Sequence, residues 1–393
     1  MAKPAQTDAE MLAPYVNNTT PENQAATLRN QDKVWPVRVI RRGGAVRPLP
    51  LHARSLDDLT FTSGEVRLGP HDFMARHRTA GLLVLKGGEI ALERYGMGND
   101  PESRWTSFST AKSITSTLVG AALHDGAIAG LDDPCGLYLP RLVGSAYEEV
   151  TIRNVLRMSS GVAWREDNDA DGRSDVYRLG KAMVARRPGS VLDLMCSLPR
   201  AHPPGVVFNY STGETCLLAA VVVAATRRPL ADYAAEWIWG PGGMEADGYW
   251  QLESEEGLEL GGLGVGLRLR DAARFGQLVL EEGLAFSGRR VLPLGWRDLA
   301  GRPDSPATAF GRLKPGDPGG YGYQWWVVPP MPGGVNNGAF SAIGAHGQLI
   351  FINPAEQVVV AIHSAWRQEQ DAAASLDTVA LIRAAVLALR AGV

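Results

Sequence analysis

The stretch 108-FSTAKSITSTLVG-120 places one lysine inside a run of small, hydroxyl-bearing and apolar residues. From Thr110 to His124 the small and apolar residues recur at helical spacing, and Asp125-Gly126 is typical of a helix end. The segment therefore predicts a buried helix that carries Lys112 in its first turn. A lysine in such surroundings calls for a chemical explanation.

Lysine is scarce in this chain, which favours a specific role for Lys112. Of 39 basic residues only six are lysines, and the others are arginines. A guanidinium stays charged at any working pH, whereas a desolvated ammonium can lose its proton. A lysine in an apolar segment is thus more useful as a base than an arginine would be.

Ser109 and Lys112 are three residues apart, so on a helix their side chains share one face. A neutral amine there can accept the Ser109 proton, which is the serine–lysine form of nucleophile and base. The backbone N–H of Ser109, at the helix N-terminus, would also help to hold an oxyanion. The alternative interpretation is an N-cap serine followed by a lysine whose amine extends to solvent.

Two later segments carry further candidates. In 203-PPGVVFNYSTGETCLLAA-220, Tyr210 lies between a short predicted strand and an apolar predicted helix. A phenol at such a junction can relay a proton, and the alternative interpretation is a half-buried structural tyrosine. In 341-SAIGAHGQLIFINP-354, two glycines flank Ala345 and His346 where a strand begins. Glycine permits the close approach that substrate binding at a strand edge needs, and this edge could supply a second oxyanion donor. His346 taken alone could equally be structural.

Strand patterns at both ends of the chain indicate an α+β fold. The stretch 81-GLLVLKGGEIALERYG-96 reads as a hairpin, and the last third holds further strand segments before a terminal helix. Helical patterns lie between them. We expect one antiparallel sheet built from both chain ends and flanked by helices, with an inserted helical lobe.

The predicted boundaries are a Pro-rich N-terminal surface arm over 1–60 and one domain over 61–393. Within that domain we expect an α/β lobe from about 61–125 and 255–393, and a helical lobe from about 126–254. With 393 residues and 45% apolar content, the chain can bury a large core.

Composition narrows the class of partner. The net charge of −3 and the pI near 6.2 give no basic footprint for nucleic acid or an anionic membrane, so we expect a small-molecule substrate. The start of the chain lacks the pattern of a secretory signal, and no apolar run approaches a membrane span, which predicts a cytoplasmic protein. The chain has three cysteines without CxxC spacing, so we expect no disulfide framework. Its seven histidines are dispersed, so we expect no catalytic metal, and we expect no cofactor. A homodimer is left open.

The three segments, in this order, resemble the serine hydrolases of the β-lactamase and penicillin-binding-protein fold. The branch that the sequence most resembles includes 6-aminohexanoate-dimer hydrolase, family VIII carboxylesterases and class C β-lactamases, and the resemblance runs from about residue 80 to 366. It implies a β-lactamase/transpeptidase-like fold in which Ser109 is acylated and Lys112 and Tyr210 share the proton transfers. It also implies an oxyanion hole formed by the N–H groups of Ser109 and Ala345, and hydrolysis of an ester or amide by water.

Departures from that family's pattern shape the expected substrate. Lactamases place Lys-Thr-Gly at the strand edge, where this chain has His346 and Gly347 as candidate substrate contacts, and it has Tyr-x-Thr in place of Tyr-x-Asn. A substrate-closing tyrosine of the dimer hydrolases is matched by Asn168. Trp325, next to Trp326, could line an apolar cleft. The alternatives are β-lactamase or D-peptidase activity, or a non-catalytic penicillin-recognising or sensory domain.

A polar loop between the helical segments offers a competing interpretation. Residues 167-DNDADG-172 copy the first half of a calcium-binding loop, but Arg178 stands where that loop needs a bidentate glutamate. An acidic lid over the active site is favoured instead, and its charge would attract an amine-bearing substrate.

Overall fold

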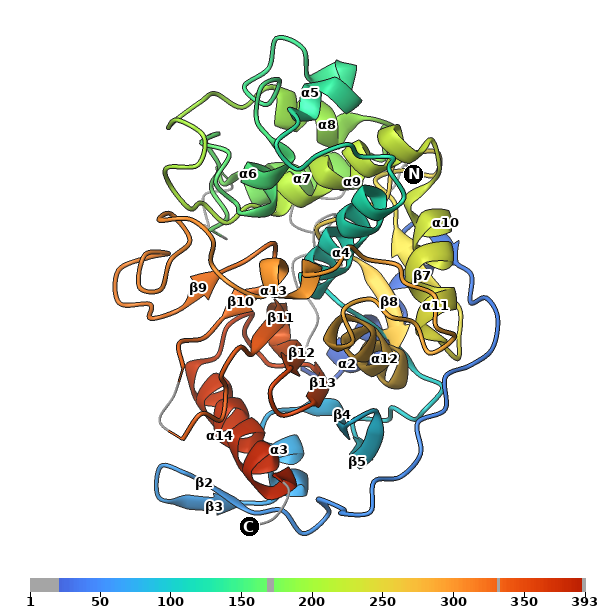
Figure 1. Ribbon diagram of the computed structural model, residues 1–393, viewed down its shortest axis with the longest axis vertical. Coiled ribbons are helices and arrows are strands. Elements are labelled where there is room, and N and C mark those ends of the chain that lie inside the picture. Colours follow the sequence, from blue (N-terminus) through green and yellow to red (C-terminus); the bar gives the residue numbers. More distant parts are fainter. Residues whose placement is uncertain (1–20, 168–172, 331–332, 391–393) are drawn as a thin grey trace, which may run out of the picture.

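A seven-stranded antiparallel sheet forms the centre of the protein in the computed structural model, which describes residues 21–167, 173–330 and 333–390 (Figure 1). The strand order is β5-β4-β13-β12-β11-β10-β9. Its strands are β4 (Thr79–Lys86), β5 (Glu89–Tyr95), β9 (Gly320–Tyr321), β10 (Trp326–Val327), β11 (Phe340–Gly344), β12 (Gln348–Asn353) and β13 (Val358–Ser364). The antiparallel sheet from both chain ends is therefore confirmed.

Both faces of this sheet are covered by helices. Along β4, Leu83 and Leu85 belong to the core shared with α12 (Leu269–Leu280) and α4 (Thr110–His124), whereas Leu82 and Val84 belong to the core that contains α14 (Ala372–Leu389). Successive side chains of a strand point to opposite faces, so a strand covered on both sides reads as a continuous apolar run. This explains the unbroken apolar stretch in β4.

Helix α14 is long and apolar enough to cross a membrane by length and composition alone, the one such helix among the described residues, and 39% of it is buried within the protein. Its buried side includes Leu381 and Val386, which pack in the same core as Phe351 of the sheet. This packing makes the buried side of the helix part of the protein core.

A second, four-stranded antiparallel sheet brings the N-terminal region into the fold. Its order is β1-β7-β8-β6, with strands β1 (Val37–Ile40), β6 (Arg104–Thr106), β7 (Gly248–Gln251) and β8 (Val265–Arg268). The expected surface arm is corrected here, because the described part of 1–60 contains α2 (Gln24–Arg29) and β1, and Trp35 and Ile40 are buried. A strand of four residues is too short to show a hydrophobic period, so β1 could not be predicted from its pattern.

The helical region lies at one end of the molecule, above α4 in Figure 1, away from α3 (Pro70–Arg76) and the β2 (Phe61–Ser63) and β3 (Val66–Leu68) ribbon. It contains α5 (Cys135–Tyr138), α6 (Ile152–Leu156), α7 (Asp175–Ala185), α8 (Ser190–Cys196) and α9 (Thr212–Thr226). Three further elements lie to the side of α4, near β7: α10 (Leu230–Ala234), a π-helical turn (Ala235–Trp239) and α11 (Gly240–Gly242), whereas α13 (Trp296–Ala300) lies nearer the sheet. Helix α9 is buried from Thr212 to Val222 and packs against α4. Helix α4 therefore lies between the helical region and the sheet.

Candidate active site

Ser109 lies at a sharp turn between strand β6 and helix α4. Ser107 is fixed to β8 by two hydrogen bonds, since its N–H donates to the Val265 carbonyl (2.7 Å) and its Oγ accepts from the Val265 N–H (3.1 Å). Phe108 then takes a left-handed conformation (φ 44°), which is strained for a residue other than glycine. Ser109 follows as the N-cap of α4 and is half-buried, so the turn presents its hydroxyl at the start of the helix.

The Lys112 amine is held in the interior by three oxygen atoms. Its Nζ lies 2.8 Å from Ser109 Oγ, 2.9 Å from Thr212 Oγ1 and 2.9 Å from the Gly262 carbonyl oxygen. Only 2% of the lysine is exposed. The alternative of a lysine extending to solvent is thus wrong, and the amine contacts the serine one helical turn away.

The Gly262 carbonyl reaches Lys112 because the chain passes very close to α9. A Cβ added at Gly262 would lie 2.5 Å from the Thr212 carbonyl oxygen, and one at Gly261 would lie 2.5 Å from the Thr215 carbonyl oxygen. Real side chains do not tolerate such distances, so this approach requires glycine at both positions. The close packing places an obligate acceptor beside the amine.

Tyr210 completes the group that the sequence predicted. Its ring centroid lies 4.9 Å from Lys112 Nζ, just before the residue Ser211 that caps α9. Trp326 and Tyr321 hold the ring, with centroids 5.4 and 6.3 Å from that of Tyr210. The structure therefore brings Ser109, Lys112 and Tyr210 together from two helix N-termini.

The strand edge after β11 adjoins Ser109. A Cβ added at Gly344 would lie 2.6 Å from the Ser107 carbonyl oxygen and 3.2 Å from the Ser109 backbone nitrogen. Ala345, the next residue, is half-buried. This contact places the backbone of 344–345 beside the N–H of Ser109, where two donors could converge on one oxygen.

His346 and Gly347 do not face a substrate as expected. The buried His346 donates from Nδ1 to the Trp366 carbonyl (2.7 Å), and burial lowers the pKa of its imidazole. Gly347 packs so closely on Trp366 that an added Cβ would lie 2.3 Å from that indole. Both residues belong to the support of the strand edge, which corrects their prediction as substrate contacts.

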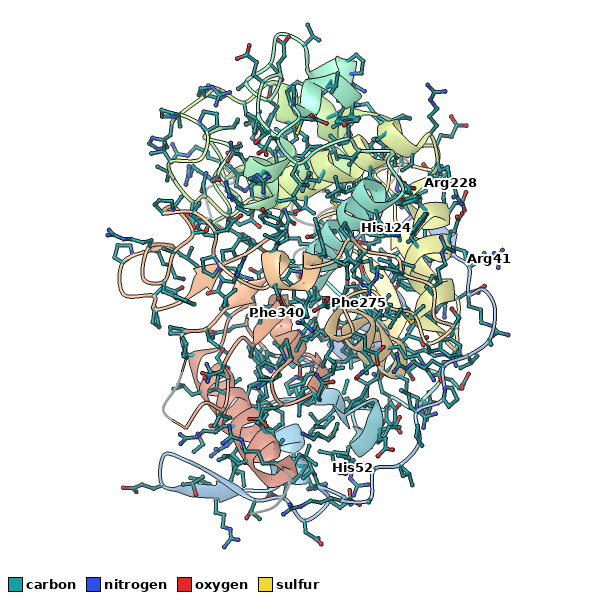
Figure 2. The ribbon with its side chains drawn as sticks, viewed as in Figure 1. Arg41, His52, His124, Arg228, Phe275 and Phe340 are labelled. Carbon is teal, nitrogen blue, oxygen red and sulfur yellow. The ribbon has the colours of Figure 1, made fainter. Side chains whose placement is uncertain are left out.

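Trp325 is also corrected as a cleft-lining residue. It is fully buried between Phe275 of α12 and Phe340 of β11, with ring centroids 6.1 and 5.0 Å away. Figure 2 labels these two rings in the middle of the molecule, between α12 and the sheet. The neighbouring half-buried Trp326 is the tryptophan that reaches Tyr210, because successive residues of an extended segment point to opposite sides.

The prediction for Asn168, and most of the calcium-like motif, falls on 168–172, outside the described residues. Arg178, at the motif's would-be twelfth position, pairs with Asp175 on α7 (2.7 Å). In the described ranges no three His, Cys, Asp or Glu side chains gather as a metal site would require.

Sequence reasoning missed the polar residues behind Lys112. Thr212 occupies the position where the family pattern has asparagine, and its hydroxyl contacts the amine that the sequence assigned to Ser109 alone. Glu166, from the polar loop after α6, accepts hydrogen bonds from the Thr212 hydroxyl and N–H. The position of Thr212 in Tyr-x-Thr was the available signal, whereas nothing in the loop distinguished Glu166 from its acidic neighbours.

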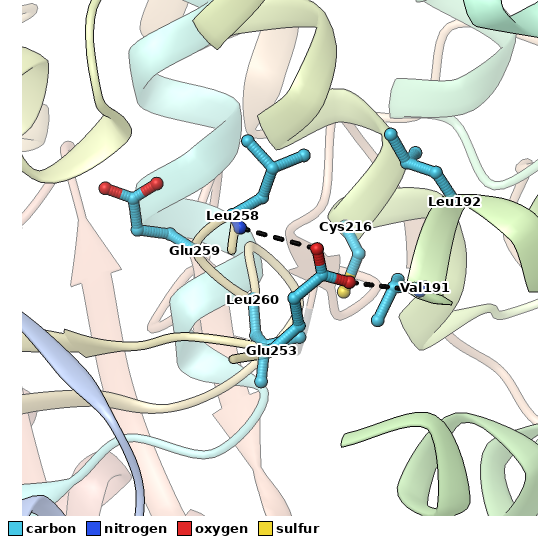
Figure 3. Close-up of a pocket in the computed structure, with 7 residues that line it drawn as sticks. All are labelled: Val191, Leu192, Cys216, Glu253, Leu258, Glu259 and Leu260. Atoms are coloured by element: carbon cyan, nitrogen blue, oxygen red, sulfur yellow. Dashed lines mark hydrogen bonds between the residues drawn. The ribbon is translucent and has the colours of Figure 1, made fainter. Parts of the chain in front are cut away.

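A small cavity elsewhere in the helical region is separate from this site. It lies between Cys216 of α9, the start of α8 and the segment 253–260 (Figure 3). Glu253 closes it by accepting from the N–H groups of Val191 (3.0 Å) and Leu258 (3.5 Å). Since Ser109 and Lys112 are not among its lining residues, we assign it to packing.

Glu214, on the first turn of α9, is a buried acid that influences stability. Ser160 Oγ and Tyr147 OH donate to one carboxyl oxygen, and Oε2 has no hydrogen-bond partner among the described residues. Burial raises the pKa of Glu214 to about 8. The folded protein therefore keeps a proton on this carboxyl at neutral pH.

Glu214→Gln should flatten the pH dependence of stability between about pH 4.5 and 8. In that window the folded wild type holds a proton that the unfolded chain has lost, so its free energy of unfolding falls as pH rises, by up to about 1.4 kcal/mol per pH unit. Glutamine removes this titration and keeps the shape. Urea unfolding at pH 5, 6, 7 and 8 measures the difference between the two proteins. Parallel curves for variant and wild type would contradict the assignment.

The antiparallel sheet from both chain ends, with the Ser109 helix between it and the helical region, defines the β-lactamase/transpeptidase-like class of fold. The family model described as Beta-lactamase matches residues 71–384. The chain belongs to the β-lactamase family of hydrolases.

Proteins of similar sequence and proteins of similar structure include hydrolases with the same name. The 6-aminohexanoate-dimer hydrolase of Paenarthrobacter ureafaciens is 29% identical over 293 residues, which are 73% of each chain. A solved structure titled "Putative 6-aminohexanoate-dimer hydrolase from Bacillus anthracis" superposes with a TM-score of 0.82 over 97% of this chain and 96% of that one, at 22% identity. A family VIII carboxylesterase gives a TM-score of 0.59 over 80% and 93% of the chains, at 16% identity. These structural matches confirm the predicted fold.

Proposed function

We propose that this hydrolase cleaves amide or ester bonds of small molecules through an acyl-enzyme formed on Ser109. The observation that carries the proposal is the 2.8 Å contact between Lys112 Nζ and Ser109 Oγ, made by a lysine of which 2% is exposed. An amine removed from water and adjacent to a hydroxyl is suited to act as its base. The sequence similarity to a 6-aminohexanoate-dimer hydrolase supports the same class of reaction.

The proposed reaction has two steps. Lys112 takes the proton of Ser109 as Oγ attacks the substrate carbonyl, and the oxyanion is held by the N–H groups of Ser109 and Ala345. The proton then passes, by way of Lys112 and Tyr210, to the leaving amine or alcohol as its bond to carbon breaks. A water molecule attacks the acyl-enzyme in the second step, which releases the acid and returns the proton to Ser109.

The surroundings of Ser109 favour substrates whose acyl part carries no charge near the carbonyl. Trp326 packs beside Tyr210, and Ile343, just before Gly344, is 44% exposed. His346, in the segment that stands where lactamases carry Lys-Thr-Gly, is buried, and burial lowers its pKa, so it is neutral at pH 7. A β-lactam carboxylate would find no positive charge on this side chain, so we expect linear amides and short esters to be better substrates than cephalosporins.

Mass spectrometry with a hydrolysis panel tests the proposal. Rapid mixing with p-nitrophenyl butyrate should give one butyryl adduct on the Ser109 peptide, followed by steady release of butyrate. The panel compares this ester, the linear 6-aminohexanoate dimer and nitrocefin. A permanent adduct would indicate a penicillin-recognising sensor instead, preferred nitrocefin turnover would indicate a lactamase, and an adduct on another residue would contradict the site.

Tyr210→Phe should lower kcat by about 100-fold for an amide and much less for a p-nitrophenyl ester. An amine leaves only when protonated, whereas p-nitrophenolate leaves without a proton, and a positioned acid contributes about 10²–10⁴-fold. Steady-state kinetics on both substrates give the ratio. Tyr138→Phe, which removes a hydroxyl bonded to Asp133 in the helical region, is the control. Equal losses on amide and ester would argue against a proton-relay role.

A further inference from the structure

We propose that Glu166 is a positioning residue for Lys112: acting through Thr212, it sets the direction of the hydrogen bonds at the lysine amine and supplies a negative charge for the ammonium formed during acylation. The inference rests on the proposed function, because it assigns Lys112 the role of base. It adds a residue that does not contact Ser109 in the structure.

The contacts form a chain of three residues. Lys112 Nζ lies 2.9 Å from Thr212 Oγ1, and that hydroxyl donates to Glu166 Oε1 at 2.5 Å. The other carboxyl oxygen, Oε2, accepts from the Thr212 N–H (2.9 Å) and from Trp164 Nε1 (2.5 Å). The carboxyl group is therefore held by three donors at the N-terminus of α9, and its orientation is fixed.

Counting protons at Lys112 gives the reason for this arrangement. A neutral amine has two N–H groups and one lone pair. The Gly262 carbonyl can only accept, and Thr212 must also accept, because its own proton is directed to Glu166. Both N–H groups are then used, so the lone pair is left for the third partner, the Ser109 hydroxyl. A carboxyl at position 166 thus prepares the amine to receive the Ser109 proton.

The same arrangement suits the state after proton transfer. The ammonium has three N–H groups for three acceptors, Ser109 Oγ, Thr212 Oγ1 and the Gly262 carbonyl, and Glu166 lies one hydroxyl beyond. Burial raises the pKa of Glu166, whereas the Lys112 charge and the hydrogen bonds from Thr212 and Trp164 oppose that rise. The carboxyl and the amine are therefore coupled through charge as well as through Thr212.

Other titratable groups face this pair from the neighbouring elements. They are Tyr210, Tyr321 of β9 and Cys216 of α9. Burial raises the pKa of Cys216 to about 11 and that of Tyr321 well above its usual range, so both stay neutral between pH 5 and 9. Neither group therefore adds a charge beside Lys112 and Glu166 in this range.

Glu166→Gln should lower kcat/KM about tenfold, because the ammonium formed in the transition state loses the negative charge that lies one hydroxyl away. Thr212→Val should lower kcat/KM by a similar factor, and Thr212→Ser, which keeps the hydroxyl, should restore it. Because Glu166 acts through Thr212, the Glu166→Gln/Thr212→Val double variant should be no slower than Thr212→Val.

Glu253→Gln is the matched control, since Glu253 is a buried acid that also accepts backbone N–H groups but is absent from the contacts of Lys112. It should change thermal stability without lowering kcat/KM. Unchanged kcat/KM in Glu166→Gln, or losses that multiply in the double variant, would overturn the inference. If Glu166→Gln fails to fold, equal rates for Thr212→Val and wild type would overturn it instead. Retained turnover in Ser109→Ala would contradict the proposed function itself. Failure of the proposed function can therefore be distinguished from failure of the role assigned to Glu166.

Discussion

Ser109→Ala should abolish turnover of p-nitrophenyl esters and amides, with kcat reduced by about 10⁵-fold and no covalent adduct. The variant removes the only atom that can carry the acyl group in the proposed reaction, and the oxyanion donors alone cannot form the intermediate. The Ser109 hydroxyl is half-buried and bonded to Lys112, so its loss should cost little stability. Stopped-flow kinetics and intact-protein mass spectrometry, with thermal unfolding as a check on folding, give the result.

Ser113→Ala provides the matched control for this experiment. Ser113 lies one turn further along α4, and its buried hydroxyl donates to the Gln324 carbonyl at 2.7 Å. Its removal leaves that carbonyl unpaired and should lower the free energy of unfolding by about 1 kcal/mol, with turnover retained. Turnover above 1% of wild type in Ser109→Ala would contradict the assignment of the nucleophile.

The features that sequence predicted well are those fixed by local spacing. Helix α4 spans Thr110–His124, the predicted range, because small and apolar residues keep a helical period that ends at Asp125 and Gly126. Ser109 and Lys112 meet for the same reason, since three residues of helix bring them to one face. The apolar runs of β4 and β13 likewise predicted strands, and the structure shows that they are continuous because the sheet is covered on both faces.

The features that sequence could not supply depend on contacts between distant segments. Gly262 reaches Lys112 only because 261–262 pack against α9, and Glu166 reaches Thr212 across 46 residues. The pattern of two adjacent tryptophans gave no basis for choosing which one faces inward, and the structure buries Trp325. In each case the deciding quantity is the relative placement of elements, which no local period encodes.

Lys112→Met should reduce kcat/KM for a p-nitrophenyl ester about 10³-fold, the size of effect that loss of a positioned base produces. Methionine has a similar length and an apolar stem, so it fills the same space beside Ser109, Thr212 and Gly262. It leaves the Gly262 carbonyl and the Thr212 hydroxyl without their donor, which should cost about 1–3 kcal/mol of stability. Activity assays and urea unfolding on the same preparation separate the two effects.

Lys112→Arg distinguishes a base from a positive charge. Arginine keeps the charge but does not lose its proton at working pH, so a variant that folds and remains inactive would identify proton acceptance as the role of Lys112. If the ammonium charge alone assisted catalysis, Lys112→Arg would recover much of the rate that Lys112→Met loses. Lys86→Met is the control, because Lys86 donates to the Glu356 carbonyl (2.7 Å) at the far end of β4, and its loss should leave turnover unchanged. Activity in Lys112→Arg near the wild-type rate would remove the base from the proposed mechanism, and with it the reason for a lysine in the first turn of α4.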